Sequence, residues 1–167
     1  MTWHRSSSPK DRFFACLPYL LPLIEVVTFS SALFAQLPLL GTIYLVTIGP
    51  FLAVYAFLGR VIPFVGLIIF FALFLLVVRN ERIAHFIRYN TLQAIIISIV
   101  ISLCSLVLQL FGTLGANLSA IPLFGDVIFN LIFLAVVSAS VYSIVQCIRG
   151  RYAEIPIISE AVYTQVR

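Results

Sequence analysis

The sequence predicts an all-α, polytopic integral membrane protein with four transmembrane helices, one additional re-entrant or interfacial apolar segment and a short amphipathic helix. Of its 167 residues, 62% are hydrophobic and 10% are charged, whereas soluble domains are about 45–50% apolar and about 25% charged. Its long uncharged runs are continuously apolar rather than alternating, which favours spanning helices over a membrane barrel. The runs without Asp, Glu, Lys or Arg are Val26–Gly59, Val61–Val78, Tyr89–Gly125 and Val127–Ile148.

The same composition argues against a soluble enzyme, a disordered chain and a nucleic-acid-binding module. A soluble domain of this size would expose large apolar patches, and such patches cause association. The net charge of +4 comes from basic residues at the ends of apolar runs, without interleaved stacking aromatics, so we expect no nucleic-acid partner. Cys16, Cys104 and Cys147 form no CxxC pair and are odd in number, which predicts buried thiols rather than disulfides or a zinc site.

The chain divides into a polar basic N-terminal tail (1–12), a four-helix transmembrane domain (13–148) and a C-terminal surface tail (149–167). Pro18 and Pro22 interrupt the apolar stretch from Phe13 to Ile24 and Glu25 follows it directly, which favours a retained segment over a cleaved signal peptide. Short breaks such as Leu37-Pro38 and Gly59-Arg60 separate the next segments. The five apolar segments are Phe13–Gln36, Leu39–Leu58, Val61–Val78, Thr91–Phe111 and Val127–Ile148.

The distribution of the arginines predicts four membrane crossings, although the chain has five apolar segments. Four crossings place all basic clusters on one side of the membrane and the uncharged 112–125 loop on the other, as the positive-inside rule prefers. One early segment must then be re-entrant, interfacial or joined to its neighbour as a broken helix. Both 13–36 and 39–58 are candidates, and the sequence does not choose between them. The clusters are Arg5, Lys10 and Arg12; Arg79, Arg82 and Arg88; and Arg149, Arg151 and Arg167.

The stretch Arg79–Asn90 differs from the apolar segments. Ile83, Phe86 and Ile87 repeat at helical spacing, while basic side chains occupy much of the remaining surface. This pattern predicts a short amphipathic helix at the membrane interface, with its arginines toward lipid headgroups. An ordinary basic loop between two crossings is the equally weighted alternative.

Motifs for nucleotide binding, metalloprotease chemistry and the hydrolase nucleophile are absent from the sequence, so we expect no enzyme activity, no metal site and no cofactor. Glu25 is the most informative single residue, because an ionisable group inside a membrane segment costs about 2.5–3.5 kcal/mol at a helix centre and therefore indicates a functional or paired group. A location near the interface is the alternative. His85 and Arg88 are candidates for contacts with anionic headgroups.

Two apolar segments each carry a polar stripe on one helix face. Such stripes are typical of helix–helix packing in membranes, and they also suit a hydrophilic groove that a translocating polypeptide could use. The first stripe is Ser98, Ser102, Ser105 and Gln109, and the second is Ala135, Ser138, Tyr142 and Gln146.

Several motifs together resemble one known family. They are Cys16–Leu23 (CLPYLLPL) followed by Glu25, Val77–Asn80 (VVRN), His85–Asn90 (HFIRYN), and Tyr152–Pro156 (YAEIP) with Glu160–Tyr163 (EAVY). In this order and spacing they resemble the twenty-kilodalton membrane subunit of the translocon at the inner envelope of chloroplasts (the Tic complex), including its cyanobacterial and plastid-encoded relatives. The resemblance extends from about residue 13 to residue 166.

This resemblance implies four helical crossings, both termini on the stromal or cytoplasmic side, and a non-enzymatic role in protein import across the plastid inner envelope or the corresponding cyanobacterial membrane. Its implied partners are other translocon membrane subunits and preproteins in transit, besides the lipid headgroups expected from the arginines. Two alternatives stay open: a small solute or ion-coupled transporter that uses Glu25, and a structural scaffold subunit of a membrane complex.

Overall fold

The computed structural model describes residues 8–113, 122–155 and 158–165, and every regular element in these ranges is helical. Among the described residues, four helical stretches are long and apolar enough to cross a membrane, namely Pro9–Phe29, Pro38–Val61, His85–Phe111 and Gly125–Ile148, and Val65–Val78 forms a shorter apolar helix. The predicted fold class is therefore confirmed. The elements are α1 (Pro9–Cys16), η1 (Leu17–Tyr19), α2 (Leu20–Glu25), η2 (Val26–Phe29), α3 (Ser31–Gln36), α4 (Pro38–Val61), α5 (Val65–Ala72), η3 (Leu73–Val78), α6 (His85–Thr113), α7 (Pro122–Ile148) and α8 (Ile158–Gln165).

The first helical stretch starts at a capping box and continues through two prolines. The Ser8 hydroxyl accepts from the Asp11 backbone N–H, and the Asp11 side chain accepts from the Ser8 backbone N–H. Pro18 lies in the 3₁₀ turn η1, where the tighter winding absorbs the missing backbone donor, and α2 resumes directly after it. The proline-interrupted segment is thus a continuous helical path from Pro9 to Phe29.

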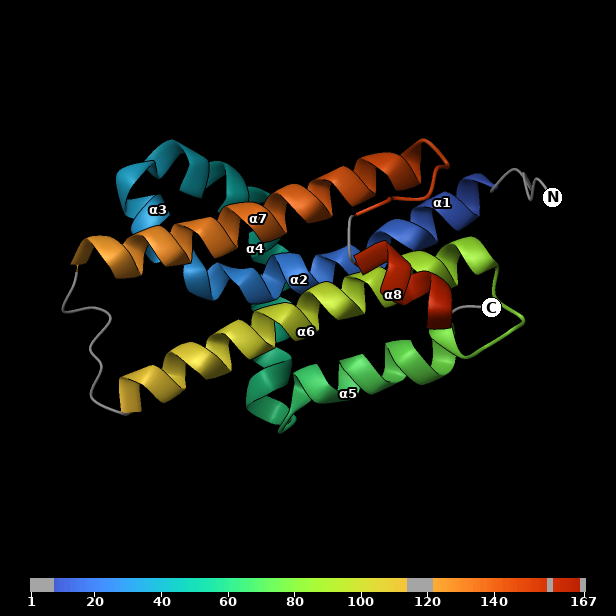
Figure 1. Ribbon diagram of the computed structural model, residues 1–167, viewed down its shortest axis with the longest axis horizontal. Coiled ribbons are helices and arrows are strands. Elements are labelled where there is room, and N and C mark those ends of the chain that lie inside the picture. Colours follow the sequence, from blue (N-terminus) through green and yellow to red (C-terminus); the bar gives the residue numbers. More distant parts are fainter. Residues whose placement is uncertain (1–7, 114–121, 156–157, 166–167) are drawn as a thin grey trace.

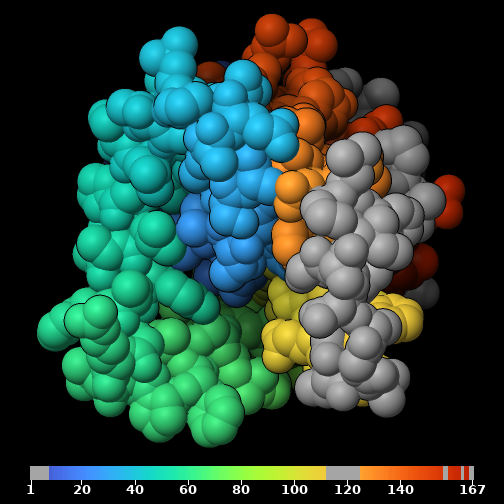
Figure 2. Space-filling view, turned by 90° about the vertical axis from the view of Figure 1, so that its left-hand side faces the viewer, coloured from blue at the N-terminus to red at the C-terminus, as the bar shows by residue number. Residues whose placement is uncertain are grey.

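The helix α4 has a different direction from the rest of the bundle. The stretch from α1 to η2, the stretch from α5 to η3, α6 and α7 run alongside one another, whereas α4 runs across them (Figure 1). The end-on view of Figure 2 shows the same helix extending along one side of the molecule. Of the two segments that the sequence left open, 39–58 is the one that departs from the bundle direction.

Contacts with α2 and α3 hold α4 in this position. The Tyr44 hydroxyl donates to the Leu23 carbonyl at 2.6 Å, and its ring lies 5.3 Å from that of Phe133 on α7. The connection to α5 turns sharply at Phe64, which has a φ of 57° in the left-handed region. A sharp turn after a helix as long as α4 lets the chain rejoin the bundle direction in α5.

The main core joins the first helical stretch to α6 and α7. Tyr19, Val26, Ile97 and Phe133 are among its buried members. Large apolar side chains also cover the outside of the bundle, for example on α4, where Val46 is 73% exposed. Such a surface is expected when the surrounding solvent is hydrocarbon rather than water.

The predicted short amphipathic helix at 79–90 is wrong as a separate element. Residues 79–84 form turns, and His85–Asn90 is the first part of the long helix α6. Phe86, Tyr89 and Asn90 are buried, so this face packs on protein instead of lying on a membrane surface. The helical spacing of Phe86 and Ile87 therefore reflected the start of a buried helix.

Described members of the three basic clusters gather at one end of the bundle, which we call the basic end. It contains the start of α1, the η3–α6 connection and the end of α7 (Figure 1). Arg12 Nη1 donates to the Ile148 carbonyl at 3.4 Å, and Arg88 Nε donates to the Val78 carbonyl at 2.8 Å. Arg5, Arg167 and residues 114–121 of the predicted uncharged loop lie outside the described residues.

Candidate functional site

A partly polar cavity lies among α2, η2, α4 and α6, and we call it the Glu25 cavity. Its volume is about 410 Å³. It brings together Glu25 from the first apolar segment with Ser102 and Ser105 from the polar stripe of α6. The sequence had identified these residues in separate segments without placing them side by side. The lining residues are Ile24, Glu25, Val27, Thr28, Leu52, Tyr55, Ile101, Ser102 and Ser105.

Glu25 lies at the end of α2 and is half-buried. Within the described part of the chain, the Glu25 carboxyl group and the neighbouring Ser98 hydroxyl lie close enough to interact, although neither Glu25 Oε2 nor Ser98 Oγ, both buried, makes a well-formed hydrogen bond. On the opposite side, Tyr55 of α4 reaches over α5 at Gly66. A Cβ atom at Gly66 would lie 2.9 Å from the Tyr55 hydroxyl oxygen and 4.0 Å from Glu25 Oε1.

This arrangement can bind a hydrogen-bonding ligand or water. A buried polar atom without a partner is costly, and polar side chains inside membrane segments usually face the bundle interior or a wet cavity. The hydroxyls around Glu25 can both donate and accept. Among residues 8–113, 122–155 and 158–165, no group of three or more His, Cys, Asp or Glu could hold a metal ion.

The rest of the predicted polar residues lie outside this cavity. Gln109 is exposed further along α6, and on α7 Ser138 and Tyr142 are exposed while Gln146 is half-buried. Ser140 and Ser143 are instead the fully buried serines of α7. Most of the α7 stripe therefore lies on the outer side of the bundle, and none of its members lines the Glu25 cavity with the α6 serines.

A second polar centre, which the sequence analysis missed, lies near the basic end, and we call it the tail cluster. The Tyr19 hydroxyl is placed to donate to Asn90 Oδ1 (3.1 Å) or Gln93 Oε1 (3.2 Å). Gln93 Nε2 donates to the Ala153 carbonyl at 3.1 Å, and Cys147 Sγ donates to Asn90 Oδ1 at 3.1 Å. The cluster thus ties η1, α6, α7 and the C-terminal tail together.

The signal for this cluster was present in the sequence. Asn90, Thr91 and Gln93 are consecutive or near-consecutive polar residues at the start of a strongly apolar helix, and all three are fully buried. Buried polar groups of this kind generally need partners. His85 is exposed at the same end, and its Nδ1 lies 3.1 Å from the Tyr152 hydroxyl, so the tail covers part of the surface predicted for headgroups.

Comparison with known proteins gives consistent results along the whole chain. The family model described as "Chloroplast import apparatus Tic20-like" matches residues 6–162. The chain is 42% identical to the "Tic20 family protein" of Synechocystis sp., with 100% of this chain and 99% of that protein covered. It is 36% identical to the "Tic20 family protein Ycf60" of Gracilaria tenuistipitata var. liui (93% and 75% covered). It is 27% identical to "Protein TIC 20-II, chloroplastic" of Arabidopsis thaliana (93% and 72% covered).

Proposed function

The chain belongs to the Tic20-like family of the chloroplast import apparatus, and from this membership we propose that it is a membrane component of a protein-import translocon. Its role is to help preproteins cross the chloroplast inner envelope or the corresponding cyanobacterial membrane. The single observation that carries the proposal is the family match over residues 6–162. The match includes the four apolar helices that, in the part of the chain that the structure describes, are long enough to cross a membrane.

The Glu25 cavity supports a passive mechanism for this role. A polypeptide that crosses a membrane carries backbone groups that need hydrogen-bond partners. Ser102, Ser105 and Glu25 offer such partners from two helices at membrane depth. The energy would come from partner subunits, because the sequence contains no nucleotide-binding motif. Other translocon membrane subunits, preproteins in transit and lipid headgroups are the proposed partners.

A crosslinking experiment tests this mechanism. A photoreactive amino acid at Ser102 should capture a transit-arrested preprotein, because Ser102 lines the cavity. The matched control is Leu103, which is 55% exposed on the next position of α6 but does not line the cavity. Capture of lipid at both positions, with no preprotein at Ser102, would contradict the proposed path.

We further propose four crossings in which α4 and α5 together form the second, broken crossing. The gathering of the described members of the three basic clusters at one end of the bundle supports this arrangement. Both termini would then lie on the stromal or cytoplasmic side. Single cysteines introduced at Lys10 and Arg151 should react with an impermeant thiol reagent from the same side of sealed vesicles. Labelling from opposite sides would exclude an even number of crossings.

An ion-coupled transporter is the second candidate, and one observation favours it. The Glu25 Oε2 atom has no hydrogen-bond partner in the described structure, as expected of a carboxyl group that binds a transient cation or proton. Glu25→Gln would abolish ion-coupled solute flux in liposomes if the chain is such a carrier. Under the import proposal, the reconstituted wild-type protein shows no coupled flux to lose.

A further inference from the structure

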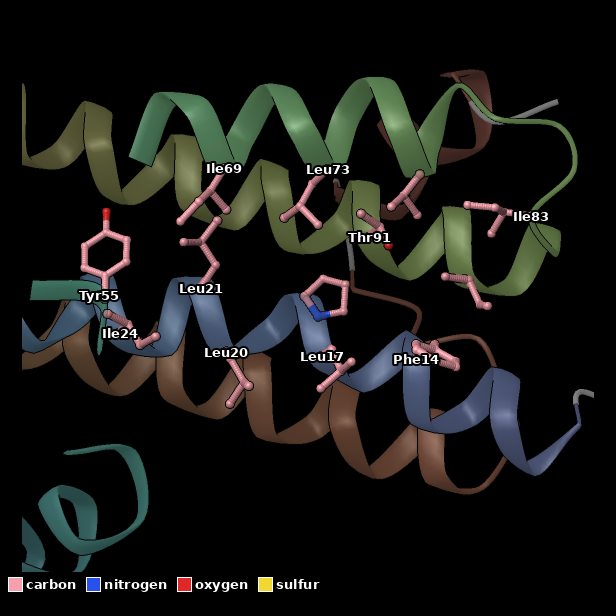
Figure 3. A pocket seen from close by; sticks show the side chains of 13 residues that line it. Phe14, Leu17, Leu20, Leu21, Ile24, Tyr55, Ile69, Leu73, Ile83 and Thr91 are labelled. Carbon is pink, nitrogen blue, oxygen red and sulfur yellow. The ribbon is translucent and has the colours of Figure 1, made fainter. Parts of the chain in front are cut away.

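An apolar groove of about 540 Å³ lies between the first helical stretch and α5–η3, with α6 beside it (Figure 3). It is a separate feature from the Glu25 cavity, although Ile24 and Tyr55 line both. Tyr55 stands at one end of the groove, and Ile83 and Phe14 stand at the other. The groove is open to the outside of the bundle.

The groove runs from membrane depth to the basic end. Phe14 and Ile24 line its two ends on one helical path, and ten residues of helix correspond to about 15 Å. This length equals half of the roughly 30 Å hydrocarbon thickness of a bilayer. The groove therefore has the depth of one leaflet, which is the depth that a lipid acyl chain occupies.

Basic residues surround the end of the groove at Phe14 and Ile83. Arg82 precedes Ile83, and Arg79 follows the lining residue Val77 by two positions, and both arginines are exposed. Arg88 Nε donates to the Val78 carbonyl at the same place. The connection from Arg79 to Arg88 beside this mouth carries three arginines against one acidic residue, Glu81, which leaves a positive excess there.

We propose that the groove binds one acyl chain of an anionic membrane lipid, with the lipid headgroup held at Arg79 and Arg82. The apolar wall suits a hydrocarbon chain, and the positive mouth attracts a phosphate-type headgroup. A polypeptide fits poorly, because Thr91 and Tyr55 are the only hydroxyl-bearing side chains in the lining and a backbone at this depth needs many hydrogen-bond partners.

The local backbone explains why a groove exists here. Residues Leu73–Val78 form a π-helix, and the Arg79 backbone N–H donates to the Phe74 carbonyl at 3.0 Å. A π-helix widens the turn and interrupts regular side-chain rows, and such segments often occur at binding sites. Leu73 and Val77 of this wider turn face the groove, while Pro18 supplies a flat wall on the opposite side.

Photolabelling of the full-length chain in nanodiscs tests the proposal. The probe is phosphatidylglycerol with a diazirine in one acyl chain, in a background of phosphatidylcholine, and mass spectrometry maps the adducts. Adducts should concentrate on the groove residues Leu21 and Leu73. Leu73→Trp fills the groove and should lower the Leu21 adduct about tenfold, which corresponds to a loss of about 1.4 kcal/mol. The matched control Leu76→Trp, at a position that is 67% exposed and outside the lining, should leave the adduct unchanged.

The headgroup is tested separately. The double variant Arg79→Gln, Arg82→Gln should remove the preference for the phosphatidylglycerol probe over the same probe built on phosphatidylcholine, while thermal unfolding stays as in wild type. Equal labelling of wild type by both probes would overturn the headgroup part. The whole proposal would be overturned if adducts spread evenly over exposed α4 positions such as Val46 and Val54. It would also be overturned if no adducts formed in the groove because a peptide or a second copy of the chain fills it. If Leu73→Trp fails to fold, Ile69→Trp replaces it.

Discussion

The hydroxyl oxygen of Tyr55 lies 2.9 Å from the position that a Cβ atom on Gly66 would occupy. Real Cβ atoms essentially never approach another heavy atom so closely. Glycine at this position therefore lets a side chain of the crosswise helix α4 pass over α5 and reach the surroundings of Glu25.

The first prediction concerns Gly66. Gly66→Ala should be about 1 kcal/mol less stable than an unhindered glycine-to-alanine change in a helix, because the added methyl group must displace the hydroxyl end of Tyr55. Gly59→Ala is the matched control: a Cβ atom there would meet only Val65 at an ordinary 3.6 Å, so it should be neutral or stabilising by up to about 1 kcal/mol through helix propensity. Thermal unfolding in detergent measures the stability of both variants. Adding Tyr55→Phe should restore part of the loss at Gly66, and an unchanged loss would exclude a clash with the hydroxyl.

The second prediction concerns the tail cluster. Tyr19→Phe removes the hydroxyl that contacts Asn90 and Gln93, and leaving a buried acceptor without its donor should cost about 1–3 kcal/mol. Tyr142→Phe is the control, because Tyr142 is 42% exposed on the outer side of α7. Equal unfolding temperatures for the two variants would show that the Tyr19 hydroxyl contributes nothing to stability.

The third prediction concerns the end of α7. Gly150 has a φ of 71°, the Gly150 N–H donates to the Cys147 carbonyl, and the Arg151 N–H donates to the Gln146 carbonyl. This is a glycine cap in which a Cβ atom costs about 1–2 kcal/mol. Gly150→Ala should therefore lower stability and speed proteolytic removal of the tail. Gly59→Ala, within α4 and with only an ordinary contact at 3.6 Å, should leave the tail protected.

The fourth prediction separates stability from function at Glu25. Glu25→Leu should stabilise the isolated protein by about 1–3 kcal/mol, because it removes a buried oxygen that has no partner among the described residues. The same variant should reduce crosslinking of a preprotein at Ser102. Loss of stability in Glu25→Leu, measured by thermal unfolding, would show that the carboxyl group makes a stabilising contact within the protein, for which Ser98 is the nearest candidate.

The helices themselves could be predicted from the sequence, since long uncharged apolar runs have few other solutions in a membrane. The sequence could not predict which face of each helix lies inside the bundle. In lipid, apolar residues cover both the core and the outside, so hydrophobic periodicity does not distinguish the buried Ser140 and Ser143 from the exposed Ser138 and Tyr142. The basic clusters indicated the ends of the apolar helices more clearly than hydrophobic periodicity indicated their buried faces, because charged side chains are excluded from the hydrocarbon on every face of a helix.

The direction of α4 relative to the bundle could not be predicted from the sequence either. Leu39–Leu58 is long enough and apolar enough to cross a bilayer, and nothing local distinguishes a crossing helix from one that lies across its neighbours. The contact of Tyr44 with the Leu23 carbonyl and the turn at Phe64 decide it. Both are tertiary features, and the second places a bulky residue where glycine is the usual choice.

The short apolar helix Val65–Val78 has a consequence for the membrane around the protein. At the rise of an α-helix, its fourteen residues cover about 21 Å, which is less than the roughly 30 Å of hydrocarbon in a typical bilayer. Hydrophobic mismatch of this kind is relieved by local thinning of the lipid. In the proposed topology, the hydrocarbon layer would therefore be thinnest on the α5 side, and the distance that a polar cargo must travel without water would be shortest there.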